Sequence, residues 1–276
     1  MPEKSTFFCF GPPKSGTTLL QRCLDLHPMI SCPSEHHFDF LHERFGSLFQ
    51  EYNRGLDVTD LRTGGQGASH VLQSTVTKIF RATIYEILCQ SAKDKPISGI
   101  NDNSMISRLA LFKHLFPEAK FIAIFRHPIP RAVSAWHYNL LLAQDEQDPK
   151  HLQLLQQYGS YDKWILMLAD QFNLSVDHYR LAFESDPNAM RIKYEDLVSN
   201  KVQVLQKLFR FLDAPWNDVL LRNIVEATDF NVMRAKARRP HFFRAASESP
   251  TEESISIELQ KQVHAMTEDS LTYLEY

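Results

Sequence analysis

The stretch Thr6-Phe-Phe-Cys-Phe-Gly-Pro-Pro-Lys-Ser-Gly-Thr-Thr18 decides the fold of this chain. It begins with an aromatic, β-prone run that stops at Gly11 and two prolines. After Gly16 the apolar residues recur with helical spacing, so the predicted order is strand, loop, helix. Backbone N–H groups and the positive end of the helix then converge on one point, beside Lys14 and neighbouring hydroxyls. We expect an anion to bind there.

A second apolar run, Lys120–Phe125, is typical of a strand that is covered on both faces. Pro128 follows it at the start of a helical pattern. Weaker strand candidates lie at Ile97–Ile100 and Met190–Tyr194. Helical patterns occupy residues 104–116, 161–172, 201–212 and 216–227. Strands that alternate with helices predict an α/β fold, in which a central parallel sheet is flanked by helices in three layers.

The composition limits the partners of the chain. Its 276 residues are 43% hydrophobic and 23% charged, which is ordinary for a folded protein and excludes disorder of the whole chain. The net charge of −3 gives no overall basic field, so we expect neither nucleic acid nor a membrane as a partner. No apolar stretch reaches the roughly 20 residues that a membrane helix needs. The four cysteines lack metal-ligand spacing and no leader is recognisable, which favours a reduced, cytoplasmic location.

We expect a single domain over residues 1–276. Segment 53–70 holds four of the nine glycines and few apolar residues, which predicts a mobile loop. Near the end, Ser249 and Pro250 form a helix-start signal ahead of apolar residues at helical spacing. This signal predicts a helix over 250–275.

The loop after the first strand is close to a known phosphate-binding pattern but departs from it. Gly11 and Gly16 keep the glycine spacing of the nucleotide-triphosphatase loop, G-x-x-x-x-G-K-[ST], so the fold is P-loop-like. Thr17 stands where the lysine of that pattern belongs, and the lysine is at position 14 instead. A nucleotide kinase or GTPase therefore lacks its essential residue here, although it stays an alternative, as does a solvated turn with a chance lysine.

A second block, Phe125-Arg-His-Pro-Ile-Pro-Arg-Ala-Val-Ser134, directly follows the second buried strand. This placement predicts that Arg126 lies at the carboxyl end of the sheet, where open α/β folds bind ligands. A guanidinium fork suits a phosphate monoester, and Ser134 is near enough in the next helix to donate a hydroxyl. The alternative is that Arg126 and Arg131 only pair with surface carboxylates.

Together the two blocks resemble the sulfotransferases that use 3′-phosphoadenosine 5′-phosphosulfate (PAPS). Residues 14–18 match the family's [RK]-S-G-T-T loop for the 5′-phosphosulfate, and 126–134 match its R-x-P-x-x-R-x-x-S block for the 3′-phosphate. Residues 192–198, with Tyr194, are similar to a third block, and the resemblance covers about residues 6–245. It implies PAPS as cofactor, PAP as product and no metal. The cofactor-binding residues it implies are Pro13, Lys14, Ser15, Gly16, Thr17, Thr18, Arg126, Ser134, Tyr194, Arg238, Arg239 and Arg244.

The last three arginines come from a basic run, residues 234–244. In the family, a late loop with a Phe-Arg-Lys-Gly motif closes over the 3′-phosphate, and Phe243-Arg244 fits its first half. Arg244 is therefore the preferred residue, with Arg238 and Arg239 behind it. A solvated face or a nucleic-acid patch is the alternative for such a run.

The residues expected to do chemistry on the acceptor follow the first helix. The segment 32–40 resembles the place where relatives carry a catalytic glutamate, and Glu35 is its match. A partly desolvated carboxylate there has a raised pKa and accepts the acceptor's proton, while His36 or His37 are alternative bases. The position that His37 occupies is often a histidine in such relatives. Lys14, Glu35 and His37 are thus the expected catalytic residues, although a solvent-exposed loop acid is the alternative for Glu35.

One departure from the family concerns the acceptor. Many relatives carry D-K-T-P before the next helix, whereas this chain has Asp102 followed by Asn103. A neutral amide beside carboxylates suits a positively charged acceptor, because like charges cost several kcal/mol when desolvated. We expect His36, Asp39, Asp102 and Asn103 to contact the acceptor. The predicted function is sulfuryl transfer to a hydroxyl or nitrogen of a small molecule, for which we favour an amine or guanidinium natural product, by a monomer or homodimer. A non-catalytic adenine-nucleotide-binding module is the alternative.

Overall fold

In this computed structural model of the chain, residues 5–63, 69–145, 149–237 and 255–276 are described. Their strands form one parallel sheet with the order β2-β3-β1-β4-β5. The strands are β1 (Ser5–Phe10), β2 (Ile30–Ser31), β3 (Ile97–Asn101), β4 (Lys120–Phe125) and β5 (Ala189–Lys193). The predicted fold class and the two main strands are confirmed. Because β1 and β4 are neighbours, the loops that follow them lie at the same edge of the sheet.

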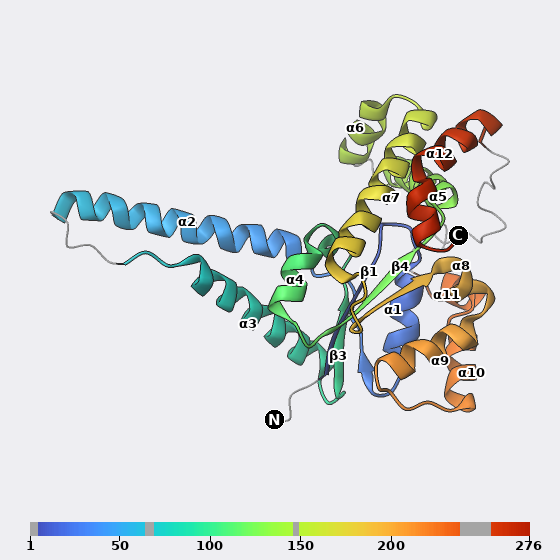
Figure 1. Cartoon of the computed structure of the whole chain (residues 1–276), viewed down its shortest axis with the longest axis horizontal. Coiled ribbons are helices and arrows are strands. Elements are labelled where there is room, and N and C mark those ends of the chain that lie inside the picture. Colours follow the sequence, from blue (N-terminus) through green and yellow to red (C-terminus); the bar gives the residue numbers. More distant parts are fainter. Residues whose placement is uncertain (1–4, 64–68, 146–148, 238–254) are drawn as a thin grey trace.

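Helices cover both faces of the sheet, as Figure 1 shows. One face is covered by α1 (Thr17–Asp25), α9 (Lys201–Phe211) and α10 (Asp218–Ala227). The other is covered by α3 (Gln73–Ala92), η1 (Asn103–Arg108), α4 (Leu109–Leu115) and α7 (Tyr161–Phe183). The remaining helices are α2 (Phe38–Thr63), α5 (Pro128–Asp145), α6 (Pro149–Tyr158), α8 (Tyr194–Ser199), α11 (Phe230–Lys236) and α12 (Ile257–Tyr273).

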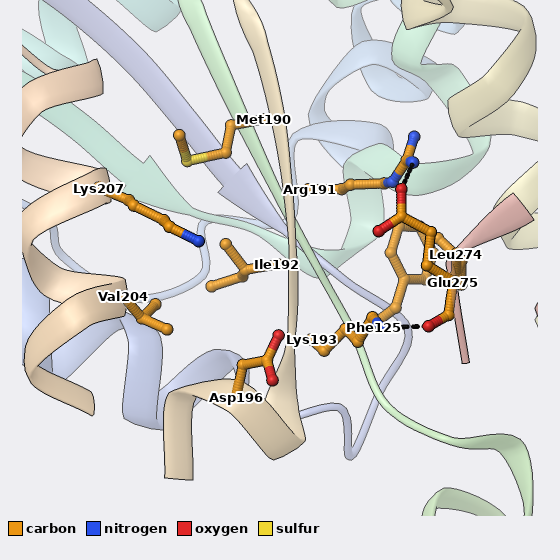
Figure 2. Close-up of a pocket in the computed structure, with 10 residues that line it drawn as sticks. All are labelled: Phe125, Met190, Arg191, Ile192, Lys193, Asp196, Val204, Lys207, Leu274 and Glu275. Carbon is orange, nitrogen blue, oxygen red and sulfur yellow. Dashed lines mark hydrogen bonds and ion pairs between the residues drawn. The ribbon is translucent and has the colours of Figure 1, made fainter. Parts of the chain in front are cut away.

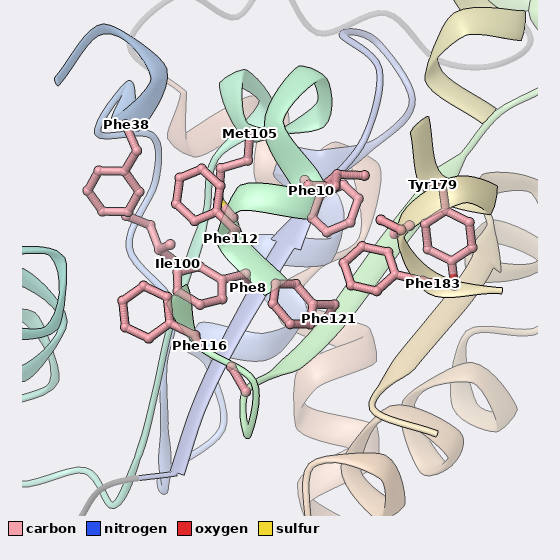
Figure 3. Close-up of a cluster of buried hydrophobic side chains, with 14 of the residues drawn as sticks. Phe8, Phe10, Phe38, Ile100, Met105, Phe112, Phe116, Phe121, Tyr179 and Phe183 are labelled. Atoms are coloured by element: carbon pink, nitrogen blue, oxygen red, sulfur yellow. The ribbon is translucent and has the colours of Figure 1, made fainter. Parts of the chain in front are cut away.

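The central strand β1 divides the core into two halves. Phe8 and Phe10 point into a cluster with α3, α4 and α7, drawn in Figure 3, where Phe8 lies 5.5 Å from Phe121 between ring centroids. Phe7 and Cys9 point to the opposite face, against α1 and α9. Each fully buried Phe contributes about 1.5–3 kcal/mol of transfer free energy. The sheet is therefore held from both sides, which fixes the loops at its carboxyl edge.

The prediction of a loop over residues 53–70 is wrong for residues 53–63. Residues 53–63 continue α2, which pairs with α3 to form a long helical hairpin that projects from the sheet in Figure 1. Gly46 and Gly55 lie within α2 and have nothing within 4 Å of an added Cβ. Glycine lowers helix propensity by about 1 kcal/mol relative to alanine, but it does not forbid a helix. The glycine content of residues 53–63 is therefore a poor indicator of a loop, because this segment is an exposed helix.

The C-terminal helix is confirmed, but it begins later than predicted. Ser256 caps α12 by accepting a hydrogen bond from Leu259 N at 3.2 Å, and the predicted cap at Ser249 lies outside the described residues. α12 packs on α7 and α5. None of the helices that the structure describes combines the length and the apolar content needed to cross a membrane.

Candidate active site

Two glycines shape the loop between β1 and α1. A Cβ at Gly11 would lie 2.3 Å from the Ile124 carbonyl oxygen. Gly16 has φ +91°, and a Cβ there would lie 2.2 Å from the ring of Tyr194. Gly16 is also the N-cap of α1, and no side chain accepts a hydrogen bond from the first turn. The loop therefore presents the N–H groups at the start of α1, as an anion site requires.

Lys14 lies in this loop with a left-handed backbone, φ +69°. Its ammonium Nζ is 4.0 Å from the centroid of the Tyr138 ring, which belongs to α5. Burial, as the larger cause, and the charge of Arg126 together lower the pKa of Lys14 from 10.5 to about 8. Among the described residues, no carboxylate forms an ion pair with this lysine.

Arg126 follows β4 and is only 8% exposed. Its guanidinium lies 4.6 Å from the Tyr194 ring centroid and donates a long hydrogen bond, 3.4 Å, to the Lys14 carbonyl oxygen. Its Nε is buried without a hydrogen-bond partner. The sequence alternative, in which Arg126 pairs with a surface carboxylate, does not hold within the described part of the chain.

Arg131, on the first turns of α5, is 1% exposed. It donates to the carbonyl oxygens of Leu168, at 2.5 Å, and Pro13, at 3.5 Å. Burial lowers its pKa to about 10, and the charge of Arg126 contributes. Carbonyls thus hold this cation, and no carboxylate of the described residues forms an ion pair with it.

The remaining predicted cofactor residues surround these cations. Ser15 is fully buried, and its Oγ has no hydrogen-bond partner. Ser134 lies half-buried in α5, and Tyr194 opens α8 between Gly16 and Arg126. The two other side chains of the loop, Pro13 and Thr18, are exposed. Arg238, Arg239 and Arg244 lie outside the described residues.

Asn103 connects Glu35 to the loop between β1 and α1 and to the start of α1. The Asn103 amide Nδ2 donates to Glu35 Oε1 at 2.5 Å and to Thr17 Oγ1 at 3.3 Å, which joins three segments that are distant in sequence. Partial burial raises the pKa of the Glu35 carboxyl above its ordinary value of 4.5, and the Asp102 charge adds to the rise. The His37 charge and the Asn103 hydrogen bond act in the opposite direction. A raised pKa suits a group that must take up a proton.

Asp102 is completely buried and joins the start of η1 to the start of α2. Its Oδ2 accepts from Phe38 N at 2.9 Å, and its Oδ1 accepts from Ser104 N at 3.0 Å and Ser104 Oγ at 2.7 Å. The carboxylate therefore caps η1 and fixes the start of α2. These bonds tie both oxygens to Phe38 and Ser104, and the predicted contact of Asp102 with an acceptor stays a prediction.

The other predicted acceptor residues lie at the start of α2. His36 and His37 are exposed, and the His36 ring stacks on Phe38 with 5.8 Å between centroids. His37 has φ +53°, and its carbonyl accepts from Leu41 N at 3.1 Å. Asp39 is half-buried, and its Oδ1 has no hydrogen-bond partner. Neither Glu35 nor Asp39 pairs with a lysine or arginine in the described residues.

Sequence reasoning missed Tyr138, which contacts the Lys14 ammonium. Its signal was available, because Tyr138 lies one helical turn beyond Ser134. A cavity of about 190 Å³ lies elsewhere, along β5 and beside Lys207 and Glu275 (Figure 2), and contains none of the predicted site residues. The described residues hold no group of three or more His, Cys, Asp or Glu side chains that could bind a metal ion.

The fold and site define a parallel α/β protein with buried cations at the carboxyl edge of its sheet. The sulfotransferase family matches this chain over residues 6–218, and the chain belongs to that family. Protein-tyrosine sulfotransferase 1 of Danio rerio is 25% identical over 225 residues, 78% of this chain and 55% of the relative. The chain thus spans about half the length of this curated relative, at 55%. The family predicted from the sequence motifs is confirmed.

Two solved structures show the same fold. A mouse sulfotransferase complexed with PAP has a TM-score of 0.51 and 16% identity, covering 98% of this chain and 84% of the other. The sulfotransferase domain from the curacin biosynthetic pathway has a TM-score of 0.51 and 17% identity, covering 97% of this chain and 99% of that domain.

Proposed function

We propose that this protein transfers a sulfuryl group from PAPS to a hydroxyl or nitrogen of a small-molecule acceptor. The observation that carries the proposal is the pair of largely buried cations, Lys14 and Arg126, which lie together without a carboxylate partner in the described chain. Like charges held in a low-dielectric site are unfavourable unless an anion neutralises them. The family membership and the PAP-bound neighbour support PAPS as that anion.

The chain's residues fit the two anionic groups of PAPS. The start of α1, Ser15 and Lys14 would hold the 5′-phosphosulfate, and the buried Ser15 hydroxyl would gain a partner there. Arg126 and Ser134 would hold the 3′-phosphate, with the unpartnered Arg126 Nε available to donate. PAPS supplies the sulfuryl group, and PAP leaves with the bridging oxygen.

In the transfer, each residue has one task. Glu35 accepts the proton from the acceptor hydroxyl or amine as the new bond to sulfur forms. Lys14 stabilises the negative charge that develops on the bridging oxygen as the bond from sulfur to that oxygen breaks. Asn103 holds the Glu35 carboxylate toward Thr17 and the phosphate loop, and so sets the distance between base and leaving group.

A cationic acceptor follows from the charge on the other side of the site. Glu35 places a carboxylate beside Asn103, which contributes no charge, and the Asp102 carboxylate acts on Glu35 from behind. Asp39 adds a further carboxylate at the start of α2, next to Ser104. An amine or guanidinium group on the acceptor would supply the missing positive charge. The relatives that are named protein-tyrosine sulfotransferases support a phenolic hydroxyl as the reacting group.

One experiment tests both the proposal and the alternative that this protein is a phosphotransferase. Thermal unfolding is measured with PAP, ATP and GTP, because a ligand at 100 times its Kd stabilises a protein by about 2.7 kcal/mol. A clear rise in Tm with PAP and a smaller one with ATP or GTP is the expected result. A rise with GTP or ATP that exceeds the rise with PAP would refute the proposal and favour the kinase. Turnover of PAPS with an acceptor then separates an enzyme from a binding module.

A further inference from the structure

The backbone on each side of Arg126 is held by hydrogen bonds. The carbonyl oxygen of Phe125, which precedes it, accepts from the Tyr276 hydroxyl at 3.2 Å. The N–H of His127, which follows it, donates to Glu195 Oε1 at 3.1 Å. The Tyr276 hydroxyl also donates to Glu195 Oε2 at 2.7 Å. Since a phenol has one proton, the shorter bond to Glu195 dominates, and the bond to Phe125 is the weaker branch.

Tyr276 is held in this position by the sheet. The preceding residue, Glu275, forms an ion pair with Arg191 at 3.0 Å and accepts a hydrogen bond from Lys193 on its carbonyl oxygen, as Figure 2 shows. The Tyr276 ring also lies 5.8 Å from the His127 ring. Partial burial and the Glu195 carboxylate raise the pKa of Tyr276, so its hydroxyl keeps its proton and remains a donor.

Glu195 connects these bonds to the guanidinium itself. It follows Tyr194, whose ring lies against the Arg126 guanidinium at 4.6 Å from its centroid. One dipeptide at the start of α8 therefore orients the Arg126 side chain with its first residue and the Arg126 backbone with its second. Tyr276 is the only part of this arrangement that comes from beyond α12, 150 residues after Arg126.

We propose that Tyr276 and Glu195 are positioning residues that fix the direction of the Arg126 fork, and that they thereby set the preference of the site for a 3′-phosphate. This rests on the proposed function. A guanidinium recognises phosphate through two parallel bonds in one plane, so a rotation of its backbone misaligns both. Tyr276 and Glu195 do not touch the nucleotide in this proposal; they act through Arg126.

The test compares two ligands that differ in one group. The Kd of PAP and of adenosine 5′-phosphate is measured by calorimetry for the wild type, Tyr276→Phe and Glu195→Gln. The ratio of the two Kd values reports the 3′-phosphate contact alone. We expect each variant to lose about fivefold or more of the wild-type preference for PAP, while its affinity for adenosine 5′-phosphate stays within about twofold. Tyr273→Phe is the matched control, because Tyr273 lies against Arg180 and Arg191 and should leave the ratio unchanged.

The outcomes separate this inference from the proposed function. A wild type without preference for PAP would refute the 3′-phosphate site itself. A wild type with the preference, and variants that keep it or that lose affinity for both ligands equally, would overturn only the positioning role. In the Arg126→Ala background, Tyr276→Phe should have no further effect on the ratio, because the group that it positions is gone. An additional loss there would also overturn the inference.

Discussion

The two sides of the site, which we propose to bind the cofactor and the acceptor, differ in burial. On the cofactor side, Arg126 and Arg131 are 8% and 1% exposed, and Ser15 is fully buried. On the acceptor side, Glu35, His36 and His37 are all exposed, whereas Asp102 behind them is buried. The sides also differ in charge, because the first gathers cations and the second gathers carboxylates. A rigid, positive side suits a fixed anionic cofactor, whereas an open, negative side suits a variable acceptor.

The largest effect on this contrast is expected from Lys14→Ala. Removing the cation beside the leaving phosphate should cost about 2–4 kcal/mol of transition-state stabilisation, since Asn103 offers no charge in reserve. The measurement is kcat/KM at saturating PAPS. Lys14→Arg is the control that keeps the charge. A loss below about fivefold would remove Lys14 from catalysis, because tenfold corresponds to about 1.4 kcal/mol.

Glu35→Gln tests the acceptor side. The variant should lose about 100-fold in kcat, the lower range for a general base, while PAP binding is retained. The pKa of Glu35 is raised, and the base must be unprotonated, so wild-type activity should fall as the pH drops through a value above 4.5. This acid limb should vanish in the residual activity of the variant. If the limb persists and only the rate falls, a histidine such as His37 becomes the better candidate.

Arg126→Ala should separate the two anion sites on the cofactor side. Its affinity for PAP should fall by tenfold or more, about 1.4 kcal/mol, while its affinity for adenosine 5′-phosphosulfate should change little, since only PAP carries the 3′-phosphate. Calorimetric titration of both ligands is the measurement. Equal losses for the two would place Arg126 away from the 3′-phosphate.

The smallest effect sharpens the charge contrast itself. Asn103→Lys would put a cation beside Glu35, where it competes with a cationic acceptor, and should raise the KM of that acceptor about tenfold through roughly 1.4 kcal/mol of repulsion. The KM values of neutral phenols and alcohols should not change. The measurement is KM for a matched pair, an aminoalkyl phenol and its alkyl counterpart. Wild-type preference for the neutral partner would refute the cationic acceptor and leave the sulfotransferase proposal intact.

The parts of the fold that the sequence predicts well are those where local chemistry decides the structure. β4 is predicted to the residue, because an unbroken apolar run ends at Arg126. The loop between β1 and α1 is also predicted well, since close contacts require glycine at positions 11 and 16. α2 is hard to predict, because it has no buried residue after Phe38 in its described part and so carries no clear apolar stripe. α3 does carry such a stripe, with buried residues every fourth position from Val76 to Ala92, so its signal was present in the sequence and was missed.

The acceptor side was only partly predictable, because its roles depend on long-range contacts. Asp102 and Asn103 are neighbours in sequence, yet one is completely buried under the start of α2 and the other reaches Glu35. No local pattern distinguishes the two. Tyr276 and Glu195 escaped prediction for the same reason, since their link to Arg126 exists only after folding.

The ring of Tyr194 fills the space between the phosphate loop and Arg126, and its fit requires that position 16 has no side chain. Three residues from three motifs thus share one steric constraint, and their evolution should be coupled. A larger residue at 16 would demand a smaller one at 194, and the guanidinium would then lose the surface on which it rests. Anyone who transplants the loop between β1 and α1 into another scaffold should therefore carry Tyr194 with it, because its ring is the spacer between that loop and Arg126.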